Sequence, residues 1–107
     1  MIPIVLVHGF MGGSEQWEEQ IKSLSKDFEV VAIDLPGFGK NNHLPVINEI
    51  IGFSDWIIAE LRRRNIKKYH LLGHSMGGMI VQEMVRSDYN NINKLILYGT
   101  GSVGVLP

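Results

Sequence analysis

A serine lies between glycines in the segment LLGHSMGG, residues 71–78. Gly73 to Gly77 matches G-x-S-x-G, a pattern in which the serine occupies a sharp strand-to-helix turn and exposes its hydroxyl. The alternative is an ordinary glycine-rich turn. An apolar run precedes the serine and a helical pattern follows it, which favours the first interpretation. We therefore predict that Ser75 is a nucleophile held at a strained, positive φ, with glycines where chain segments come close.

The segment HGFMGG, residues 8–13, follows the first apolar run and provides a second part of such a site. An oxyanion hole needs two backbone N–H groups aimed at one point, commonly from the residue after the nucleophile and from the loop after an earlier strand. Met76 and Phe10 are the candidates. A phosphate-binding loop is the competing function, but neither G-x-G-x-x-G nor G-x-x-x-x-G-K-[ST] occurs.

The partners that a catalytic serine requires are missing after Ser75. A serine hydroxyl needs a base, and the base needs a third group that orients it. In folds with this turn the acid and then the histidine follow the serine, but no histidine follows it here. Glu83 and Asp88 fall within the next helical pattern rather than after a later strand. The histidines are expected in other roles: His74 pointing away from Ser75, His70 at a strand start, His43 in a loop and His8 after the first apolar run.

Four short apolar runs alternate with helical patterns along the chain. The runs are nearly continuous, which predicts strands of a parallel sheet covered on both faces. Strand and helix alternate, which is typical of an α/β fold with right-handed crossovers. We expect four parallel strands in the spatial order second, first, third, fourth. The predicted strands are Ile4 to Val7, Val30 to Ile33, Tyr69 to Leu72 and Leu95 to Tyr98.

Three helices are expected between these strands, and each has an apolar stripe. The second and third should share one face of the sheet and the first should cover the other. The inward residues are Trp17, Ile21 and Leu24; then Ile50, Phe53, Ile57 and Leu61 in a helix from about Ile47 to Arg63; then Ile80 and Met84 in a helix from about Gly77 to Arg86.

Length and composition indicate one small globular domain of 107 residues, with 45% apolar residues and a net charge of −1. The charge gives no case for nucleic acid, and the basic residues 62–64, 67 and 68 are expected at a solvated helix end. Without cysteine there is no disulfide or thiolate metal site. No run reaches a membrane-spanning length. We expect a cytoplasmic protein with a small-molecule substrate, no metal or cofactor, and neither nucleic-acid nor membrane partners.

The segments VLVHGFMGGSEQW, VVAIDLPGFGKN, YHLLGHSMGGMIVQEM and LILYGTG, in this order, resemble blocks of the α/β-hydrolase superfamily. The resemblance covers nearly the whole chain and implies a parallel sheet with helices on both faces. It also implies Ser75 as nucleophile, Phe10 and Met76 as oxyanion donors, and His8 as a residue that organises its loop. Asp34 stands in a block that is structural in this family, so it is not expected to be the triad acid.

The resemblance also leads to expectations about the whole protein. Residues 1–107 are expected to be the N-terminal part of one α/β-hydrolase domain, ending at the junction where many relatives insert a lid. The missing C-terminal half would then be a partner that supplies acid, base and lid. The completed protein is expected to be a carboxylesterase-like serine hydrolase acting on a small ester, thioester or C–C bond, and the 107 residues alone are expected to be inactive. The alternatives are a lyase similar to the menaquinone-pathway cyclohexadiene synthase and a non-catalytic relative that only binds ligand.

Overall fold

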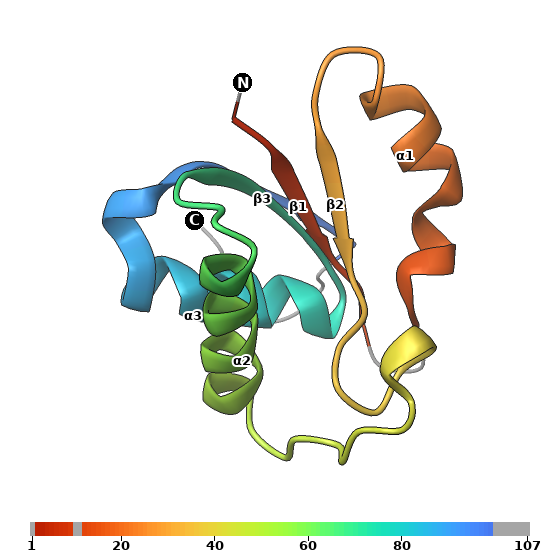
Figure 1. The fold of residues 1–107 in the computed structure, drawn as a ribbon, viewed down its shortest axis with the longest axis vertical. Coiled ribbons are helices and arrows are strands. Elements are labelled where there is room, and N and C mark those ends of the chain that lie inside the picture. The colour runs from red at the N-terminus through yellow and green to blue at the C-terminus, as the bar shows by residue number, and fades with distance from the viewer. Residues whose placement is uncertain (1, 10–11, 100–107) are drawn as a thin grey trace.

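Strands and helices alternate through residues 2–9 and 12–99, which are the residues that the structure, a computed structural model, describes. Figure 1 shows their arrangement. In chain order they are β1 (Ile4–Val7), a 3-10 turn (Ser14–Trp17), α1 (Glu18–Leu24), β2 (Val30–Ile33), a 3-10 turn (Gly39–Asn41), α2 (Ile50–Arg63), β3 (Tyr69–His74), α3 (Met76–Asp88), a 3-10 turn (Tyr89–Asn91) and β4 (Ile92–Tyr98).

The strands form one parallel sheet in the order β2-β1-β3-β4, which confirms the predicted topology. In the register, Val7 of β1 lies beside Ile33 of β2 and Gly73 of β3, and Gly73 lies beside Leu97 of β4. The carboxyl ends of the strands therefore meet at one edge, where ligands bind in open α/β sheets.

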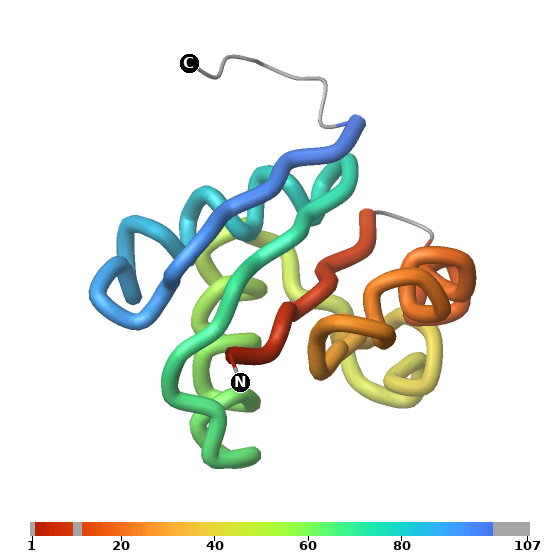
Figure 2. The backbone as a smooth tube through the Cα atoms, turned by 90° about the horizontal axis from the view of Figure 1, so that it is seen from above, coloured from red at the N-terminus to blue at the C-terminus, as the bar shows by residue number. Residues whose placement is uncertain are grey.

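The two faces of the sheet carry separate apolar clusters. Val5, Val7 and Leu71 pack with residues of α2 and α3, whereas Ile4 and Leu6 pack with Trp17 beside α1. Figure 2 shows α1 on the other side of the sheet from α3. The expectation that α2 and α3 share a face is thus confirmed. The residues expected to point inward from these two helices include Ile57, Leu61, Ile80 and Met84, and these four are fully buried.

Strand β4 differs from the expectation that each strand is covered on both faces. It lies at the end of the sheet, and Leu95, Ile96 and Tyr98 are 39%, 45% and 54% exposed. Ile96 lies beside Leu72 on the α1 side, and α1 packs against β1 and β2 without extending to β4. Leu95 lies beside Leu71 on the other side, and its partial exposure follows from the position of β4 at the end of the sheet. Its apolar run showed that the strand can be buried, but not which part of the fold would bury it.

The helix boundaries also differ slightly from those expected. Trp17 belongs to a 3-10 turn before α1, α2 begins at Ile50, and α3 extends to Asp88. At the end of α2, Glu60 forms ion pairs with Arg63 and Arg64, so this part of the basic cluster is partly neutralised at a solvated helix end. Among the described helices, none combines the length and the apolar character that crossing a lipid bilayer requires.

Candidate active site

Ser75 occupies the turn between β3 and α3, at the carboxyl edge of the sheet (Figure 1). Its backbone angles are φ 57° and ψ −124°, so the predicted positive φ is confirmed. Asn65 is the other non-glycine residue with positive φ in the described ranges. A side chain in such a region costs on the order of 1–3 kcal/mol, and strained residues of this kind concentrate at functional sites. The serine side chain is exposed, so its hydroxyl is accessible.

The glycines on either side of Ser75 are required by close packing. A Cβ on Gly73 would lie 2.5 Å from the carbonyl oxygen of Gly77, and a Cβ on Gly77 would lie 2.6 Å from that of His8. Neither backbone can move without disturbing the sheet. The two glycines therefore let α3 begin directly against the end of β1, which brings Ser75 next to the loop after that strand.

Gly9 is the residue of that loop that lies against Ser75. A Cβ on Gly9 would be 2.8 Å from Ser75 Cβ and 3.2 Å from Ser75 Oγ. The N–H of Gly12 donates to the carbonyl of Gly9 over 3.0 Å, closing the loop. Phe10, one of the two expected oxyanion donors, lies outside the described residues, as does Met11. The structure thus places Gly9, the residue before Phe10, at the serine.

Met76, the other expected donor, is the first residue of α3. The first backbone N–H groups of an α-helix have no partner within the helix, and the helix dipole makes this end positive. The Met76 side chain is half-buried against the cluster on the α2 and α3 side. Its backbone N–H is therefore at a position where it can stabilise negative charge next to Ser75.

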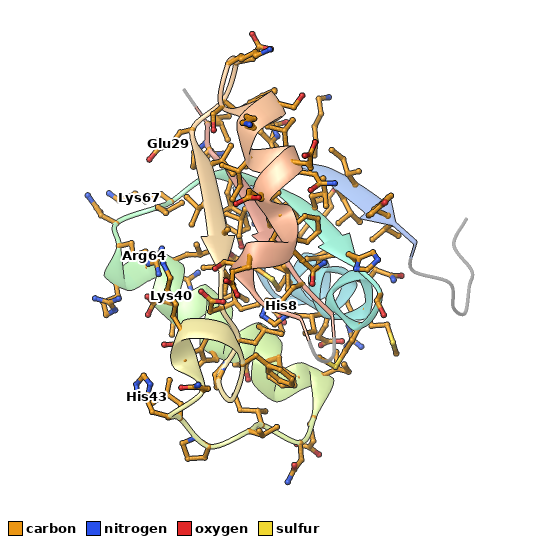
Figure 3. All side chains as sticks on the ribbon, turned by 90° about the vertical axis from the view of Figure 1, so that its right-hand side faces the viewer. His8, Glu29, Lys40, His43, Arg64 and Lys67 are labelled. Atoms are coloured by element: carbon orange, nitrogen blue, oxygen red, sulfur yellow. The ribbon has the colours of Figure 1, made fainter. Side chains whose placement is uncertain are left out.

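His8 connects the loops after β1 and β2, and it is fully buried. Its Nε2 accepts a hydrogen bond from the backbone N–H of Leu35 over 3.0 Å, so its Nδ1 carries the proton and donates to the carbonyl of Gly9 over 2.8 Å. Burial lowers the pKa of His8, because the charged form loses its hydration. In Figure 3 the ring lies inside the molecule, whereas His43 lies at its outside. These contacts fix the loop that leads to Phe10.

Asp34 follows β2 and binds the loop on the α1 side. Its Oδ1 accepts the backbone N–H of Ser14 over 2.7 Å, and its carbonyl accepts the side-chain amide of Asn41 over 2.6 Å. Gly13 and Gly39 pack so closely around this carboxylate that a Cβ on Gly13 would lie 3.3 Å from Asp34 Oδ1. The carboxylate thus has a structural role, as the sequence led us to expect.

Among the described residues, no histidine ring is hydrogen-bonded to Ser75 Oγ. His74 points instead to the α1 side, where its Nδ1 lies 3.1 Å from Gln16 Nε2 and its ring lies beside Trp17 and Tyr98. His70 contacts the ring of Phe28 at the start of β3. Of the two carboxylates after the serine, Glu83 lies 3.9 Å from Arg86 on α3 and Asp88 is at the far end of that helix. These side chains therefore have other positions or contacts within the described residues, and the lack of a triad base and acid stays a prediction.

The sequence reasoning missed a buried polar group at the opposite edge of the sheet. Asp88 accepts hydrogen bonds from Tyr69 Oη over 2.5 Å, from Arg62 over 2.9 Å and from Asn91 over 2.8 Å. Burial, followed by the Asp88 contact, raises the pKa of Tyr69. A cavity of about 420 Å³ lies beside this group. The sequence suggests Asp88 only as a candidate for a triad acid, and nothing in its spacing indicates Tyr69. No set of three metal-ligating side chains occurs in the described ranges.

Comparisons with known proteins agree with this geometry. The chain is 37% identical over 78 residues to (E)-2-((N-methylformamido)methylene)succinate hydrolase of Acinetobacter baylyi, covering 73% of this chain and 30% of that protein. It is 32% identical over 97 residues to a pimeloyl-[acyl-carrier protein] methyl ester esterase of Pseudoalteromonas atlantica, covering 90% and 36%. A thermophilic esterase from Thermogutta terrifontis superposes with a TM-score of 0.81 at 30% identity, covering 91% and 36%.

The chain thus spans about a third of the length of the curated relatives that it matches. The family model described as "alpha/beta hydrolase fold" matches residues 2–106. Together with the parallel sheet and the relatives of 37% and 32% identity, this match assigns the fold and the family. The chain belongs to the α/β-hydrolase family.

Proposed function

We propose that this chain is the nucleophile-bearing part of a serine hydrolase that acts on a small ester, thioester or C–C bond. Ser75 is the nucleophile, and the backbone N–H groups of Met76 and Phe10 form the oxyanion hole. The names of the relatives support hydrolysis: the protein from Acinetobacter baylyi is a hydrolase and that from Pseudoalteromonas atlantica is a methyl ester esterase. Our proposal extends this chemistry to the present chain.

The observation that carries the proposal is the conformation of Ser75. A non-glycine residue at φ 57° is costly, and here the cost is met by close packing of Gly9, Gly73 and Gly77. The result is an exposed hydroxyl between the start of α3 and the loop after β1. An ordinary turn would need neither the strained serine nor three glycines in close contact.

In the proposed reaction, Ser75 Oγ attacks the carbonyl carbon of the substrate while a base takes the hydroxyl proton. The carbonyl oxygen becomes an oxyanion, which the two backbone N–H groups stabilise; one such donor is worth about 10²–10³ in rate in a related chemistry. The intermediate then releases the alcohol, thiol or carbanion leaving group with a proton, and water hydrolyses the acyl-serine. In this proposal, base and acid come from outside the described residues, because no described histidine ring is hydrogen-bonded to Ser75 Oγ.

The missing groups require a further polypeptide segment, and β4 offers a surface for it. Ile96 and Tyr98 are 45% and 54% exposed on the α1 side of an edge strand. Such an edge presents unpaired backbone groups and apolar side chains together. We therefore propose that residues 1–107 form the N-terminal part of one hydrolase domain, which ends at the lid junction, and that the remaining part docks here and brings acid, base and lid. The substrate is a small molecule.

A hybrid protein tests the function. Residues 1–99 of this chain are joined to the part of the Thermogutta terrifontis esterase that follows the aligned region. A fluorophosphonate probe is expected to add one label, located by mass spectrometry at Ser75. The 107-residue chain alone should react with the probe no faster than a serine that lacks a catalytic base. In the hybrid protein, Ser75→Ala should remove labelling. Ser87→Ala, an exposed serine on α3, is the matched control and should label normally.

The outcomes separate the three functions that the sequence left open. Ester hydrolysis that depends on Ser75 supports the proposal. A hybrid protein that unfolds cooperatively, as measured by circular dichroism, yet takes no label contradicts a nucleophilic Ser75 and favours a binding protein. Labelling without turnover of esters or thioesters would contradict hydrolysis, and product analysis would then test for a lyase.

A further inference from the structure

The side chain of Gln16 joins the loop after β1 to the turn that carries Ser75. Gln16 Nε2 lies 3.1 Å from Nδ1 of His74, the residue directly before the serine. Gln16 Oε1 lies so close to Gly12 that any Cβ at that glycine would overlap it. A single amide therefore contacts both chain segments of the proposed site. The rest of the chain offers no equivalent contact among its described hydrogen bonds.

Backbone hydrogen bonds also fix the loop after β1, which Gln16 contacts. The N–H of Gln16 donates to the carbonyl of Gly13 over 3.1 Å, and the N–H of Gly12 donates to that of Gly9 over 3.0 Å. Gly9 in turn packs against Ser75. The loop thus contacts Ser75 directly at Gly9. Near Gly12 it is connected to the Ser75 turn through Gln16 and His74.

The contact between the exposed side chain of Gln16 and His74 assigns the donor and the acceptor of this pair. An amide nitrogen only donates, so His74 Nδ1 must accept, and a neutral ring must carry its proton on Nε2. The ring is also held by neighbours: its centroid lies 5.1 Å from that of Tyr98 and 6.2 Å from that of Trp17. Since the ring is confined on both sides, the amide of Gln16 is the contact that selects the tautomer.

We propose that Gln16 is a positioning residue, which holds the loop after β1 and the Ser75 turn together through a neutral, Nε2-protonated His74. Its catalytic meaning rests on the proposed function, because the two oxyanion donors come from these two segments and need a fixed separation. The bridge itself depends only on described residues. It is absent from the sequence pattern around the serine, since Gln16 is 58 positions away from His74.

Nuclear magnetic resonance of the histidine rings tests the bridge. In the 15N-labelled 107-residue chain at pH 8, His74 is expected to be the Nε2–H tautomer. In Gln16→Glu the carboxylate can only accept, so His74 should change to Nδ1–H. Gln16→Ala should give a mixture of both. Glu19→Ala, at an exposed residue of the neighbouring helix, is the control and should leave the tautomer unchanged.

The same spectra report on the loop. The amide signals of Gly9, Gly12 and Ser75 should shift in Gln16→Ala and in His74→Phe, and the double variant should shift them no further, because both changes remove one contact. An Nδ1–H tautomer in the unchanged chain, or an unchanged tautomer in Gln16→Glu, would overturn the bridge. Shifts that add in the double variant would also count against it.

A kinetic measurement separates this proposal from the proposed function. In the hybrid protein, Gln16→Ala should lower the rate of fluorophosphonate labelling by about threefold to tenfold, the range that one net hydrogen bond supports. An unchanged rate together with a changed tautomer would overturn the positioning role. Complete lack of labelling in the parent hybrid, with the tautomers as expected, would contradict the proposed function and leave the bridge intact.

Discussion

At the carboxyl edge of the sheet Ser75 is exposed and held at φ 57°, whereas at the opposite edge Tyr69 and Asp88 are buried and bonded to each other. The first edge uses glycines to bring backbone segments close and leaves the hydroxyl accessible. The second places a carboxylate where three donors satisfy it. A buried polar group with all its partners stabilises a fold, while an exposed strained one costs stability.

The difference indicates where to look for chemistry in this fold. The cavity of about 420 Å³ lies beside Asp88, yet the polar groups that Asp88 gathers there already have partners. At the Ser75 edge, the N–H groups at the start of α3 have no partner inside the helix. Available hydrogen-bonding groups, rather than the cavity beside Asp88, therefore mark the reactive edge.

The largest effect is expected at a glycine of the Ser75 edge. Gly77→Ala places a Cβ 2.6 Å from the carbonyl oxygen of His8, and this contact joins two backbones that cannot separate easily. We expect the free energy of unfolding in urea to fall by about 3 kcal/mol. Gly52→Ala is the control, because its Cβ meets the side chain of Ile47 and no backbone atom, and alanine favours a helix. Equal losses in both variants would show that the close packing of backbones at Gly77 contributes no more to stability than the contact at Gly52.

Local sequence patterns predict some features of this molecule and not others. The strand order, the faces of the helices and the positive φ of Ser75 all follow from local patterns: apolar runs, helical stripes and G-x-S-x-G. Contacts between distant side chains do not. Tyr69 bonds to Asp88 across 19 positions and Gln16 to His74 across 58, and no spacing rule relates such pairs. The exposure of β4 could not be predicted either, because an apolar run does not show which other elements pack against the strand.

The second effect concerns the Asp88 edge. Asp88→Ala leaves the buried hydroxyl of Tyr69 without its partner, and we expect a loss of about 2 kcal/mol in the free energy of unfolding. Tyr69→Phe removes the hydroxyl itself and should cost less, about 1 kcal/mol. Glu83→Ala is the control on the same helix, since its ion pair with Arg86 spans 3.9 Å near the surface. A loss at Asp88 no larger than at Glu83 would contradict a stabilising role for this edge.

The third effect is the pH dependence that His8 brings to the Ser75 edge. Burial lowers the pKa of folded His8, whereas the unfolded chain has the ordinary value of about 6.5. The unfolded state therefore binds more protons below about pH 6.5, so stability is full above that pH and falls as the pH decreases. The slope is at most about 1.4 kcal/mol per pH unit. Chemical denaturation between pH 8 and pH 5 measures how the free energy of unfolding depends on pH. His8→Asn should remove the contribution of His8 to this slope. The same slope in His8→Asn as in the unchanged chain would contradict the prediction.

The smallest effect would measure the strain at Ser75 itself. The angles φ 57° and ψ −124° lie in the region that the first central residue of a type II′ turn occupies, which favours glycine. Ser75→Gly should therefore relieve strain, but glycine also loses more conformational freedom on folding. The balance of the two predicts a net gain of up to about 1 kcal/mol in the free energy of unfolding. Ser75→Ala keeps the Cβ and the strain and should be neutral, which makes it the matched control. If glycine gained no more than alanine, the turn would hold Ser75 without strain, and the contrast between the two edges would reduce to exposure alone.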